Sequence, residues 1–286
     1  MARELGAEIV VADPFQRYRG LEIAADAPRA QDRRQVAYHL VGDLDLAHDS
    51  TAGDFAERAH AVVDRLADDG DGVPIVAGGT GLYVRAALCD LAMRPPPPPE
   101  VRAWAEALAA DPAAAMALLR SRDAAAADRV DPANPRRIAR ALERLEGGDD
   151  AASADIWQAP YRRPTLLVGV TRPRAVLHEL IRQRVRREVA EGLVPELEGA
   201  LARPDLARGP GQVIGMREVR AMQRGEMQGI DLEEALVVRT RRLARMQSTW
   251  LTRLRPDRVL DLADRPAGDA CADVVAMWRR ARGEVG

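Results

Sequence analysis

The residues that could do chemistry follow two short apolar runs. Asp13 ends the run at 7–13, and Gly78-Gly79-Thr80-Gly81 follows the run at 72–77. Both runs are rich in β-branched residues, which is typical of buried strands. In open parallel sheets, ligands bind beyond the carboxyl ends of the strands, so we expect both turns to border one crevice. A carboxylate there can act as a general base or bind a metal, and glycines let a ligand approach the backbone.

Each turn also has a purely structural interpretation. Asp13 could simply cap the loop that follows it, although Gln16 and Tyr18 supply further hydrogen-bonding groups there. The glycine turn favours anions, because N–H groups are free at the start of the next helix, and Thr80 adds a hydroxyl. Gly-rich turns between a strand and a helix are also common for steric reasons. The expected proximity of the two turns is what favours a site.

Arginines form a third candidate group in the segment 134–143. Arg136 and Arg140 are four residues apart and therefore share one face of a helix. Such a pair can bind phosphates through bidentate guanidinium contacts. A solvated helix with Arg–Glu pairs is the alternative. The same two interpretations apply to a second group of arginines, Arg182, Arg184, Arg186 and Arg187.

Other catalytic classes have little support. The four histidines have no metal-ligand spacing, so we predict no zinc site and leave any other metal ligands unassigned. Two cysteines, Cys89 and Cys271, do not support a disulfide scaffold, and their rarity favours a cytoplasmic protein. No signal peptide or membrane-spanning segment is expected. Aromatic residues make up 3% of the chain, which argues against a base-stacking surface.

Charge is unevenly distributed along the chain. The net charge is −2, and all 42 basic residues are arginine. Residues 1–93 carry 9 Arg and 16 acidic residues, whereas 136–187 carry 12 Arg and 6 acidic residues, and 239–258 carry 7 Arg and one. A GC-rich coding bias explains the absence of lysine but not the clustering. The basic stretches therefore favour a local surface for a polyanion.

The elements that would position these residues indicate an α/β fold. A helix is expected at 54–66, between the two strands, and strand–helix–strand at this spacing predicts a parallel sheet. Further strands are expected at 165–170 and 259–261, and further helices at 173–203, 231–250 and 269–283. The five prolines at 95–99 predict a hinge. We therefore expect an α/β core at 1–94 and 165–286, interrupted by a helical insertion at 95–164.

Taken in order, these segments resemble the tRNA dimethylallyltransferase (tRNA isopentenyltransferase) family over essentially the whole chain. No single motif is specific, but eight occur in register. They are Ala12-Asp13-Pro14-Phe15-Gln16-Arg17-Tyr18-Arg19-Gly20, Val36-Ala37-Tyr38-His39-Leu40, Thr51-Ala52-Gly53-Asp54-Phe55, the stretches 78–83 and 134–143, Gly192-Leu193-Val194-Pro195-Glu196, Gln212-Val213-Ile214-Gly215-Met216-Arg217-Glu218, and 241–250, which ends in Gln247-Ser248-Thr249-Trp250.

The resemblance implies transfer of a dimethylallyl group from dimethylallyl diphosphate to the exocyclic amine of an adenosine beside the anticodon of tRNA. It also implies Mg²⁺, a P-loop NTPase-like core with a helical insertion that binds the anticodon stem-loop, and, we expect, a monomer. Asp13 matches the general base and Thr80 a hydroxyl near the reacting centre. Arg140 and Arg184 match arginines that bind the diphosphate, beside Gly78 and Gly79.

The resemblance also assigns residues that contact tRNA. They are Asp13, Pro14, Phe15, Gln16, Thr80, Arg102, Arg136, Arg137, Ile138, Ala139, Arg140, Gln212, Val213, Ile214, Gly215, Met216 and Arg217.

The chain departs from the family pattern at its start. The family opens with a strand and the phosphate-binding loop G-x-x-x-x-G-K-[ST], and a chain without lysine does not contain that loop. We therefore expect that an N-terminal strand and P-loop, about 15–20 residues, are missing from the sequence. Smaller departures occur at single positions: this chain has Pro14 where the family has Ser, Asn134 where it has Asp, and Met246 where it usually has Arg. The segment 24–28 keeps only the proline of the family's Gly-Thr-Ala-Lys-Pro pattern.

Two other hypotheses remain open. A non-catalytic protein that binds the anticodon loop could use the same scaffold, and it would bind tRNA with a steep salt dependence but no diphosphate. A small-molecule kinase of the P-loop class would leave the arginine-rich insertion and the Gln247-to-Trp250 motif without a role.

Overall fold

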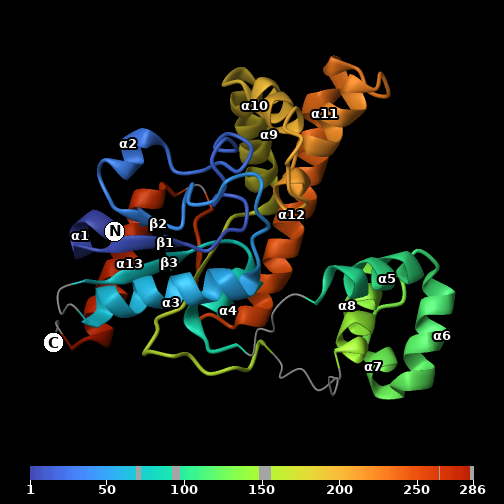
Figure 1. The fold of residues 1–286 in the computed structure, drawn as a ribbon. Helices are drawn as coiled ribbons and strands as arrows, with labels where there is room; N and C mark the ends of the chain where they lie inside the picture. The colour runs from blue at the N-terminus through green and yellow to red at the C-terminus, as the bar shows by residue number, and fades with distance from the viewer. Residues whose placement is uncertain (69–71, 92–96, 148–155, 264, 284–286) are drawn as a thin grey trace. The chain divides into compact units, whose positions relative to one another are not determined.

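Three parallel strands form the first sheet of the protein (Figure 1). A computed structural model describes residues 1–68, 72–91, 97–147, 156–263 and 265–283. The strands, in the spatial order β2-β1-β3, are β1 (Glu8–Val11), β2 (Tyr38–His39) and β3 (Pro74–Ala77). The strands predicted at 7–13 and 72–77 are confirmed by β1 and β3. β2 was not predicted, since two residues are too few to show a period.

A second pair of parallel strands forms a separate two-stranded sheet. It joins β4 (Val168–Thr171) to β5 (Arg258–Asp261), with Gly169 opposite Val259. These are the strands predicted at 165–170 and 259–261. The predicted α/β class with a parallel sheet is thus confirmed, although the described residues hold two sheets and no ladder joins β3 to β4.

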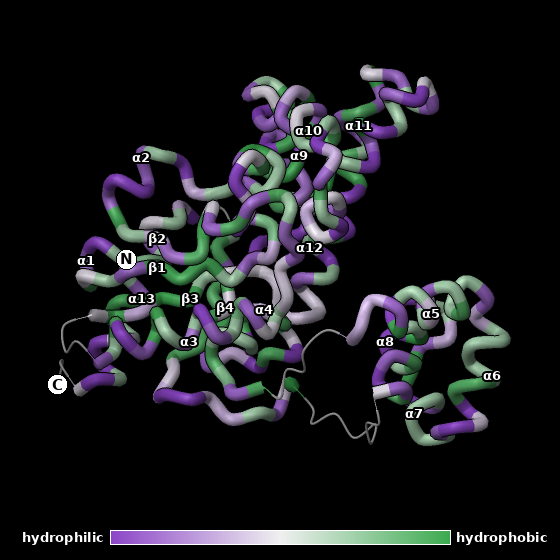
Figure 2. Tube along the Cα trace, in the orientation of Figure 1, coloured by the Kyte–Doolittle hydropathy of each residue, from purple (hydrophilic) through white to green (hydrophobic). Residues whose placement is uncertain are grey.

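Helices cover the strands, and their apolar faces form the core. In α3 the buried residues Phe55, Ala59, Val63 and Leu66 recur at helical spacing, and the Thr51 hydroxyl caps its first turn by accepting from the Asp54 N–H at 3.1 Å. Figure 2 shows the apolar residues concentrated along β1 and β3. The helices packed around the strands are α1 (Ala2–Leu5), α2 (Ala30–Arg33), α3 (Ala52–Asp68), α4 (Gly81–Leu88), α9 (Arg174–Ala190), α10 (Leu193–Leu201), α11 (Met216–Gln223), α12 (Leu232–Leu254) and α13 (Ala267–Ala281), with 3-10 turns η1 (Pro210–Gln212) and η2 (Gly229–Asp231).

One segment that was predicted as a single helix forms two helices in the structure. The single helix expected at 173–203 is two helices, α9 and α10, because Gly192 adopts the left-handed conformation with φ 105°. The chain therefore turns between them, and a glycine suits this position because it carries no Cβ. α10 then places Glu196 against the loop after β1, where its carboxylate accepts from the Ile23 N–H at 2.9 Å and the Ala24 N–H at 2.8 Å.

The chain divides into two compact units, and each is described by itself. One comprises 1–91 and 160–286, and the other comprises 92–159. The second unit is a helical cluster around Ile138, Leu142 and Leu119, all of them fully buried. Its helices are α5 (Pro99–Ala109), α6 (Pro112–Arg122), α7 (Ala124–Arg129) and α8 (Pro135–Glu146). Part of the predicted proline hinge, 95–96, lies outside the described residues.

No helix in the described ranges combines the length and the apolarity that crossing a bilayer requires.

Candidate active site

Asp13 lies at the carboxyl end of β1, with one carboxylate oxygen held by the backbone. Its Oδ1 accepts from the Phe15 N–H at 2.8 Å and from the Gln16 N–H at 3.2 Å. Among the described residues, no hydrogen-bond donor reaches Oδ2. The loop thus orients the carboxylate and leaves one oxygen for a proton or a ligand.

The glycine turn packs directly against this strand end. A Cβ added at Gly78 would overlap the carbonyl oxygen of Ala12, the residue before Asp13. A Cβ added at Gly79 would overlap the amide Nε2 of Gln247 on α12. The close approach requires glycine at position 78, where the overlapping atom is backbone, whereas at position 79 the flexible end of Gln247 would have to move. The structure therefore brings the turn at 78–79, the end of β1 and Gln247 together, and the prediction that the two turns are neighbours is correct.

Thr80 lies where the glycine turn ends and α4 begins. It is the N-cap residue of α4, and its side chain makes no capping hydrogen bond. The Thr80 carbonyl accepts from the Val84 N–H at 3.0 Å, which fixes the start of the helix. The hydroxyl is therefore not committed to the cap and can serve a ligand.

A buried arginine anchors the loop that follows Asp13. The Arg17 side chain is 0% exposed and contacts Asp43 at 2.7 Å and Asp54 at 2.9 Å. Its Nη1 also donates to the Ser50 hydroxyl at 2.9 Å, and that hydroxyl lies 3.4 Å from the Tyr83 hydroxyl. Buried charges need such compensation. The cluster ties the 13–19 loop to α3 and, through Tyr83, to α4.

The environment of Asp13 balances burial against positive charge. Burial raises the pKa of the Asp13 carboxyl above its ordinary value, since a low-dielectric environment disfavours the charged form, while the Phe15 and Gln16 N–H groups and the charge of Arg184 act in the opposite direction. The net shift is upward. A raised pKa suits a general base, because the carboxylate then binds a proton more strongly.

Arg184 lies on α9 within electrostatic reach of Asp13 and is already paired. Its Nε donates to Glu188 at 2.6 Å, and its Nη1 contacts Asp26 at 3.1 Å. Arg187 contacts the other oxygen of Asp26 at 3.2 Å. The structure thus places Arg184 within electrostatic reach of Asp13, where two carboxylates, Glu188 and Asp26, already pair with it, and its predicted diphosphate binding stays a prediction.

The other predicted arginines lie in the helical unit, on α8. The Asn134 side chain caps this helix by accepting from the Arg137 N–H at 3.3 Å, and Pro135 occupies its first turn. The three predicted arginines of α8 are exposed. Arg140 contacts Glu143 at 2.7 Å. The three arginines of α8 are Arg136, Arg137 and Arg140, and Arg102 lies on α5 of the same unit.

Four residues predicted to contact tRNA have buried side chains. Ile138 and Ala139 belong to the core of the helical unit, and Val213 and Met216 belong to the core formed with α9–α12. Their side chains hold the segments in place and do not reach the surface. Gly215, with φ 105°, is the turn before α11, where Glu218 accepts from its N–H at 3.2 Å. Of the segment 212–217, Arg217 is the exposed residue.

Two side chains close to Asp13 or to the glycine turn were not predicted as site residues. Gln247 contacts Gly79, and Tyr83 lies near enough to Asp13 that the carboxylate contributes to raising the Tyr83 pKa, which burial raises most. Tyr83 follows Thr80 by one helical turn, so spacing along α4 was the available signal. For Gln247 the signal was its place in the Gln247-to-Trp250 motif.

Across the described ranges, no group of three or more His, Cys, Asp or Glu side chains could hold a metal ion. Mg²⁺ usually keeps several waters and binds through one or two carboxylates together with substrate phosphates.

Two curated relatives are similar to this chain over most of its length. The tRNA dimethylallyltransferase of Anaeromyxobacter dehalogenans is 40% identical over 264 residues, covering 89% of this chain and 86% of that protein. The tRNA dimethylallyltransferase of Thermobifida fusca is 36% identical over 286 residues, covering 97% of this chain and 89% of that protein.

Solved structures show the same fold. The full-length tRNA isopentenylpyrophosphate transferase of Bacillus halodurans matches with a TM-score of 0.71 and 26% identity, over 99% of this chain and 90% of that one. A eukaryotic dimethylallyltransferase acting on tRNA matches with a TM-score of 0.76 and 20% identity, over 92% of this chain and 69% of that one. The model of the IPP transferase family matches residues 16–254. This chain is therefore a member of the IPP transferase family.

Proposed function

We propose that the protein transfers a dimethylallyl group from dimethylallyl diphosphate to the exocyclic amine of the adenosine 3′ of the anticodon in tRNA. The observation that carries this proposal is Asp13, at the end of β1 beside the turn of Gly78 and Gly79, with one carboxylate oxygen oriented by the backbone and the other free of donors among the described residues. Its relatives, named tRNA dimethylallyltransferases, support the reaction class.

Asp13 would act as the general base. The amine nitrogen forms a bond to the allylic carbon, the bond from that carbon to the diphosphate oxygen breaks, and the diphosphate leaves with the bonding electrons. The amine proton passes to Asp13. Its raised pKa favours this transfer, and water exclusion around the half-buried carboxylate strengthens it. Thr80 would orient the reacting groups through its hydroxyl.

The leaving diphosphate needs positive charge and N–H donors. Arg184 would stabilise it, together with the backbone at Gly78 and Gly79. The Asp26 and Glu188 partners keep Arg184 in position when no anion is bound. Mg²⁺ would accompany the diphosphate and help to neutralise its charge.

Each unit carries candidate contacts for tRNA. The exposed arginines of α8 supply phosphate contacts, as Arg102 would on α5 and Arg217 would on α11. The loop from Pro14 to Gln16 would contact the flipped base beside Asp13. The same proposal includes a monomeric protein in the cytoplasm.

A phosphate-binding loop ahead of residue 1 is the finer part of the proposal. The sequence contains no lysine and therefore no G-x-x-x-x-G-K-[ST] segment, the element that cradles phosphates in related folds. We expect the reading frame upstream of Met1 to encode a strand followed by that motif. An in-frame stop codon directly upstream would contradict this part.

The proposal is tested with labelled dimethylallyl diphosphate, Mg²⁺ and an anticodon stem-loop. Asp13→Asn keeps the shape of the side chain but removes the proton acceptor, and we expect transfer to fall about 10²- to 10⁴-fold while RNA affinity is unchanged. Wild-type turnover by Asp13→Asn would remove Asp13 from the mechanism.

A non-catalytic RNA-binding protein is the competing function. It predicts stem-loop binding that weakens steeply as the salt concentration rises. It also predicts that the wild-type chain neither transfers the dimethylallyl group, with or without an upstream segment, nor binds diphosphate. Transfer by either form would exclude it.

A further inference from the structure

The segment 42–50 is fixed to the loop that follows Asp13 by main-chain hydrogen bonds. The Leu44 N–H donates to the Arg17 carbonyl at 2.9 Å, and the Leu44 carbonyl accepts from the Arg19 N–H at 3.0 Å. This two-way exchange is the hydrogen-bond pattern of neighbouring parallel strands, here reduced to one step. The loop and the segment therefore keep a fixed register.

The same segment also contacts the chain that leads to residues 212–217, the part expected to contact RNA. The Leu46 carbonyl accepts from the Ala207 N–H at 2.8 Å. The two carboxylate oxygens of Asp45 accept from the Arg203 guanidinium at 2.7 and 3.1 Å. One segment thus touches both the loop that carries the candidate base and the chain before the candidate RNA contacts.

Asp49 and Ser50 bring these contacts to one point. The Ser50 N–H donates to the Tyr18 hydroxyl at 2.9 Å, and the Ser50 hydroxyl accepts from Arg17 at 2.9 Å. The neighbouring Asp49 carboxylate accepts from the Gly209 N–H. Tyr18, Asp49, Ser50 and Gly209 together form what we call the junction.

The junction is closely packed at Gly209. A Cβ added there would lie 2.8 Å from Asp49 Oδ1 and 3.1 Å from the Tyr18 hydroxyl oxygen, so both groups border this glycine. Glycine allows such an approach because it carries no Cβ. Gly209 also precedes η1, where its carbonyl accepts from the Gln212 N–H at 3.0 Å. The position of Gln212 is therefore set within one turn of the junction.

Tyr18 contributes a neutral hydroxyl to the junction. Its side chain is 2% exposed and belongs to the same apolar core as Val213 and Met216. Burial raises the pKa of the Tyr18 hydroxyl to about 12; the Ser50 N–H acts in the opposite direction, and the charge of Asp49 adds to the rise. The hydroxyl therefore stays protonated at neutral pH, and it accepts from Ser50 without becoming charged.

We propose that Tyr18 and Asp49 are positioning residues, which hold the segment 212–217 at a fixed place relative to Asp13. They act through the main chain of the junction and are not catalytic residues themselves. The consequence for transfer rests on the proposed function: RNA bound by this segment presents its adenosine to Asp13 only while the junction is intact. A misplacement of about 1 Å can cost about 100-fold in rate.

The first test measures transfer to an anticodon stem-loop by Tyr18→Phe and Asp49→Ala. Each variant removes one hydrogen-bond acceptor of the junction. We expect kcat at saturating RNA to fall about 10-fold or more, with KM for dimethylallyl diphosphate within about 2-fold of the wild type. KM for the diphosphate is unchanged because the glycine turn and Arg184 are not altered. Circular dichroism at the assay temperature confirms that each variant is folded.

Asp49→Asn separates the hydrogen bond from the charge. Its amide oxygen can still accept from the Gly209 N–H, whereas the alanine variant has no acceptor. We therefore expect Asp49→Asn to keep kcat within about 3-fold of the wild type. A loss as large as that of Asp49→Ala would show that charge, and not position, is responsible, and it would overturn the proposal.

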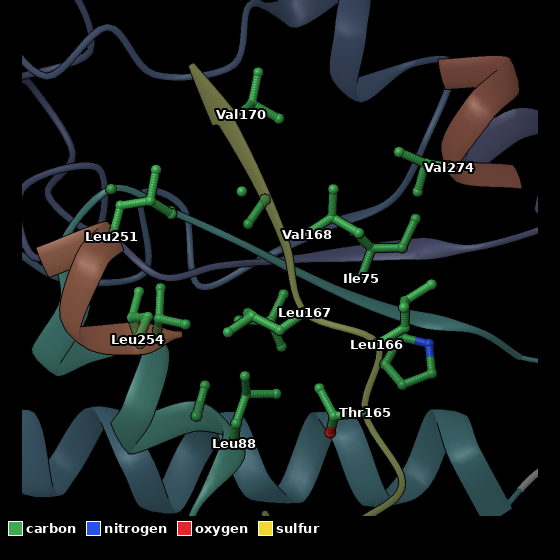
Figure 3. A pocket seen from close by; sticks show the side chains of 18 of the residues that line it. Ile75, Leu88, Thr165, Leu166, Leu167, Val168, Val170, Leu251, Leu254 and Val274 are labelled. Carbon is green, nitrogen blue, oxygen red and sulfur yellow. The ribbon is translucent and has the colours of Figure 1, made fainter. Parts of the chain in front are cut away.

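Two control variants remove matched groups outside the junction. Tyr38→Phe removes a tyrosine hydroxyl from β2, and Asp257→Ala removes a carboxylate that accepts from a distant main-chain N–H, that of Leu167, at 2.7 Å. Figure 3 shows Leu167 among the aliphatic side chains of a pocket, and none of the described residues that line this pocket belongs to the junction. Both controls should keep kcat within about 2-fold. Losses equal to those of the junction variants would overturn the proposal.

The coupling itself is tested by amide hydrogen exchange, which requires no transfer. The reporter amides are those of Phe15 and Gln16 in the loop, and those of Gln212 and Val213 at η1. Each substitution should be felt on the far side of the junction. Tyr18→Phe, in the loop, should speed exchange at η1 about 3-fold or more, and Asp49→Ala, which frees Gly209, should do the same in the loop.

The outcomes separate this inference from the proposed function. Faster exchange on the near side alone would show two local roles and would overturn the proposal. Coupled exchange with unchanged kcat in both variants would also overturn it, because the junction would then not position the reaction. Coupled exchange in a wild-type protein that transfers nothing would confirm that the junction holds the two segments together and would contradict the proposed function instead.

Discussion

Gly79 and Gln247 are in contact, although one follows β3 and the other lies near the end of the 23-residue helix α12. Any side chain at position 79 would displace the Gln247 amide. The contact therefore sets how closely α12 approaches the turn that borders Asp13. The contact between Gly79 and Gln247 therefore links the Gln247-to-Trp250 motif to the glycine turn beside Asp13 through packing.

Substituting Gly79 by Ala should lower activity more than stability. The added methyl pushes the flexible end of Gln247 aside, and a misplacement of this size near a reacting centre costs on the order of 10- to 100-fold in kcat/KM. Gly78→Ala is the matched comparison: its methyl meets the rigid Ala12 backbone, so it should cost about 1–3 kcal/mol of folding stability. Equal kcat/KM for Gly79→Ala and the wild type would contradict the expected role.

The ionised Asp13 carboxylate should cost stability at neutral pH. Its folded-state pKa is raised, so the folded protein holds the proton more tightly than the unfolded chain, and stability falls as pH rises from the unfolded pKa through the folded one. Asp13→Asn should therefore have a higher Tm than the wild type above that window, and the difference should vanish below the unfolded pKa. Thermal unfolding at several pH values measures this, and a lower Tm for the variant at pH 7 would contradict it.

Asp26→Asn should improve diphosphate binding. Asp26 holds Arg184 at 3.1 Å and Arg187 at 3.2 Å, and removing its charge leaves both guanidinium groups more available. Asn tolerates the left-handed backbone at this position, where φ is 48°. Because these pairs are partly exposed, we expect a decrease in KM of about 2- to 5-fold. The control is Asp205→Asn, which removes one of the two carboxylates that pair with Arg203 and leaves Asp45 in place; an equal change in KM for both variants would exclude a local effect.

Arg17→Lys should destabilise the protein strongly. Lysine cannot reproduce the fork that contacts Asp43 and Asp54, and the two carboxylates would lose a partner in a buried cluster, at a cost of about 3–5 kcal/mol. Arg58→Ala, which removes an exposed partner of the same two carboxylates, should cost no more than about 1 kcal/mol. Urea unfolding compares the two, and similar losses would mean that burial is not the cause.

The exposed arginines of α8 should set the salt dependence of RNA binding. Arg136→Gln and Arg137→Gln should each reduce the slope of log K against log salt by about 0.7–0.9. Arg120→Gln on α6, which pairs with Asp128 at 3.4 Å, is a control of equal charge in the same unit. A slope that changes equally in all three variants would show that net charge, and not the α8 surface, governs binding.

Much of the site was predictable because its signals are local. Asp13 and the glycine turn each follow an apolar β-branched run, and such runs mark strands whose carboxyl ends share an edge. The arginine helix begins with local signals of the same kind, the cap at Asn134 and the proline after it. The break at Gly192 was missed although glycine and a nearby proline were visible, because the apolar spacing continues through it.

Local pattern could not reveal contacts between distant segments. The pairing of Gly79 with Gln247, the carboxylates around Arg184 and the burial of Val213 and Met216 depend on how helices pack. The sequence by itself thus determined which residues could act and which elements carry them. Only the tertiary structure decided which of them meet, since long-range packing and strand pairing leave no periodic mark in the chain.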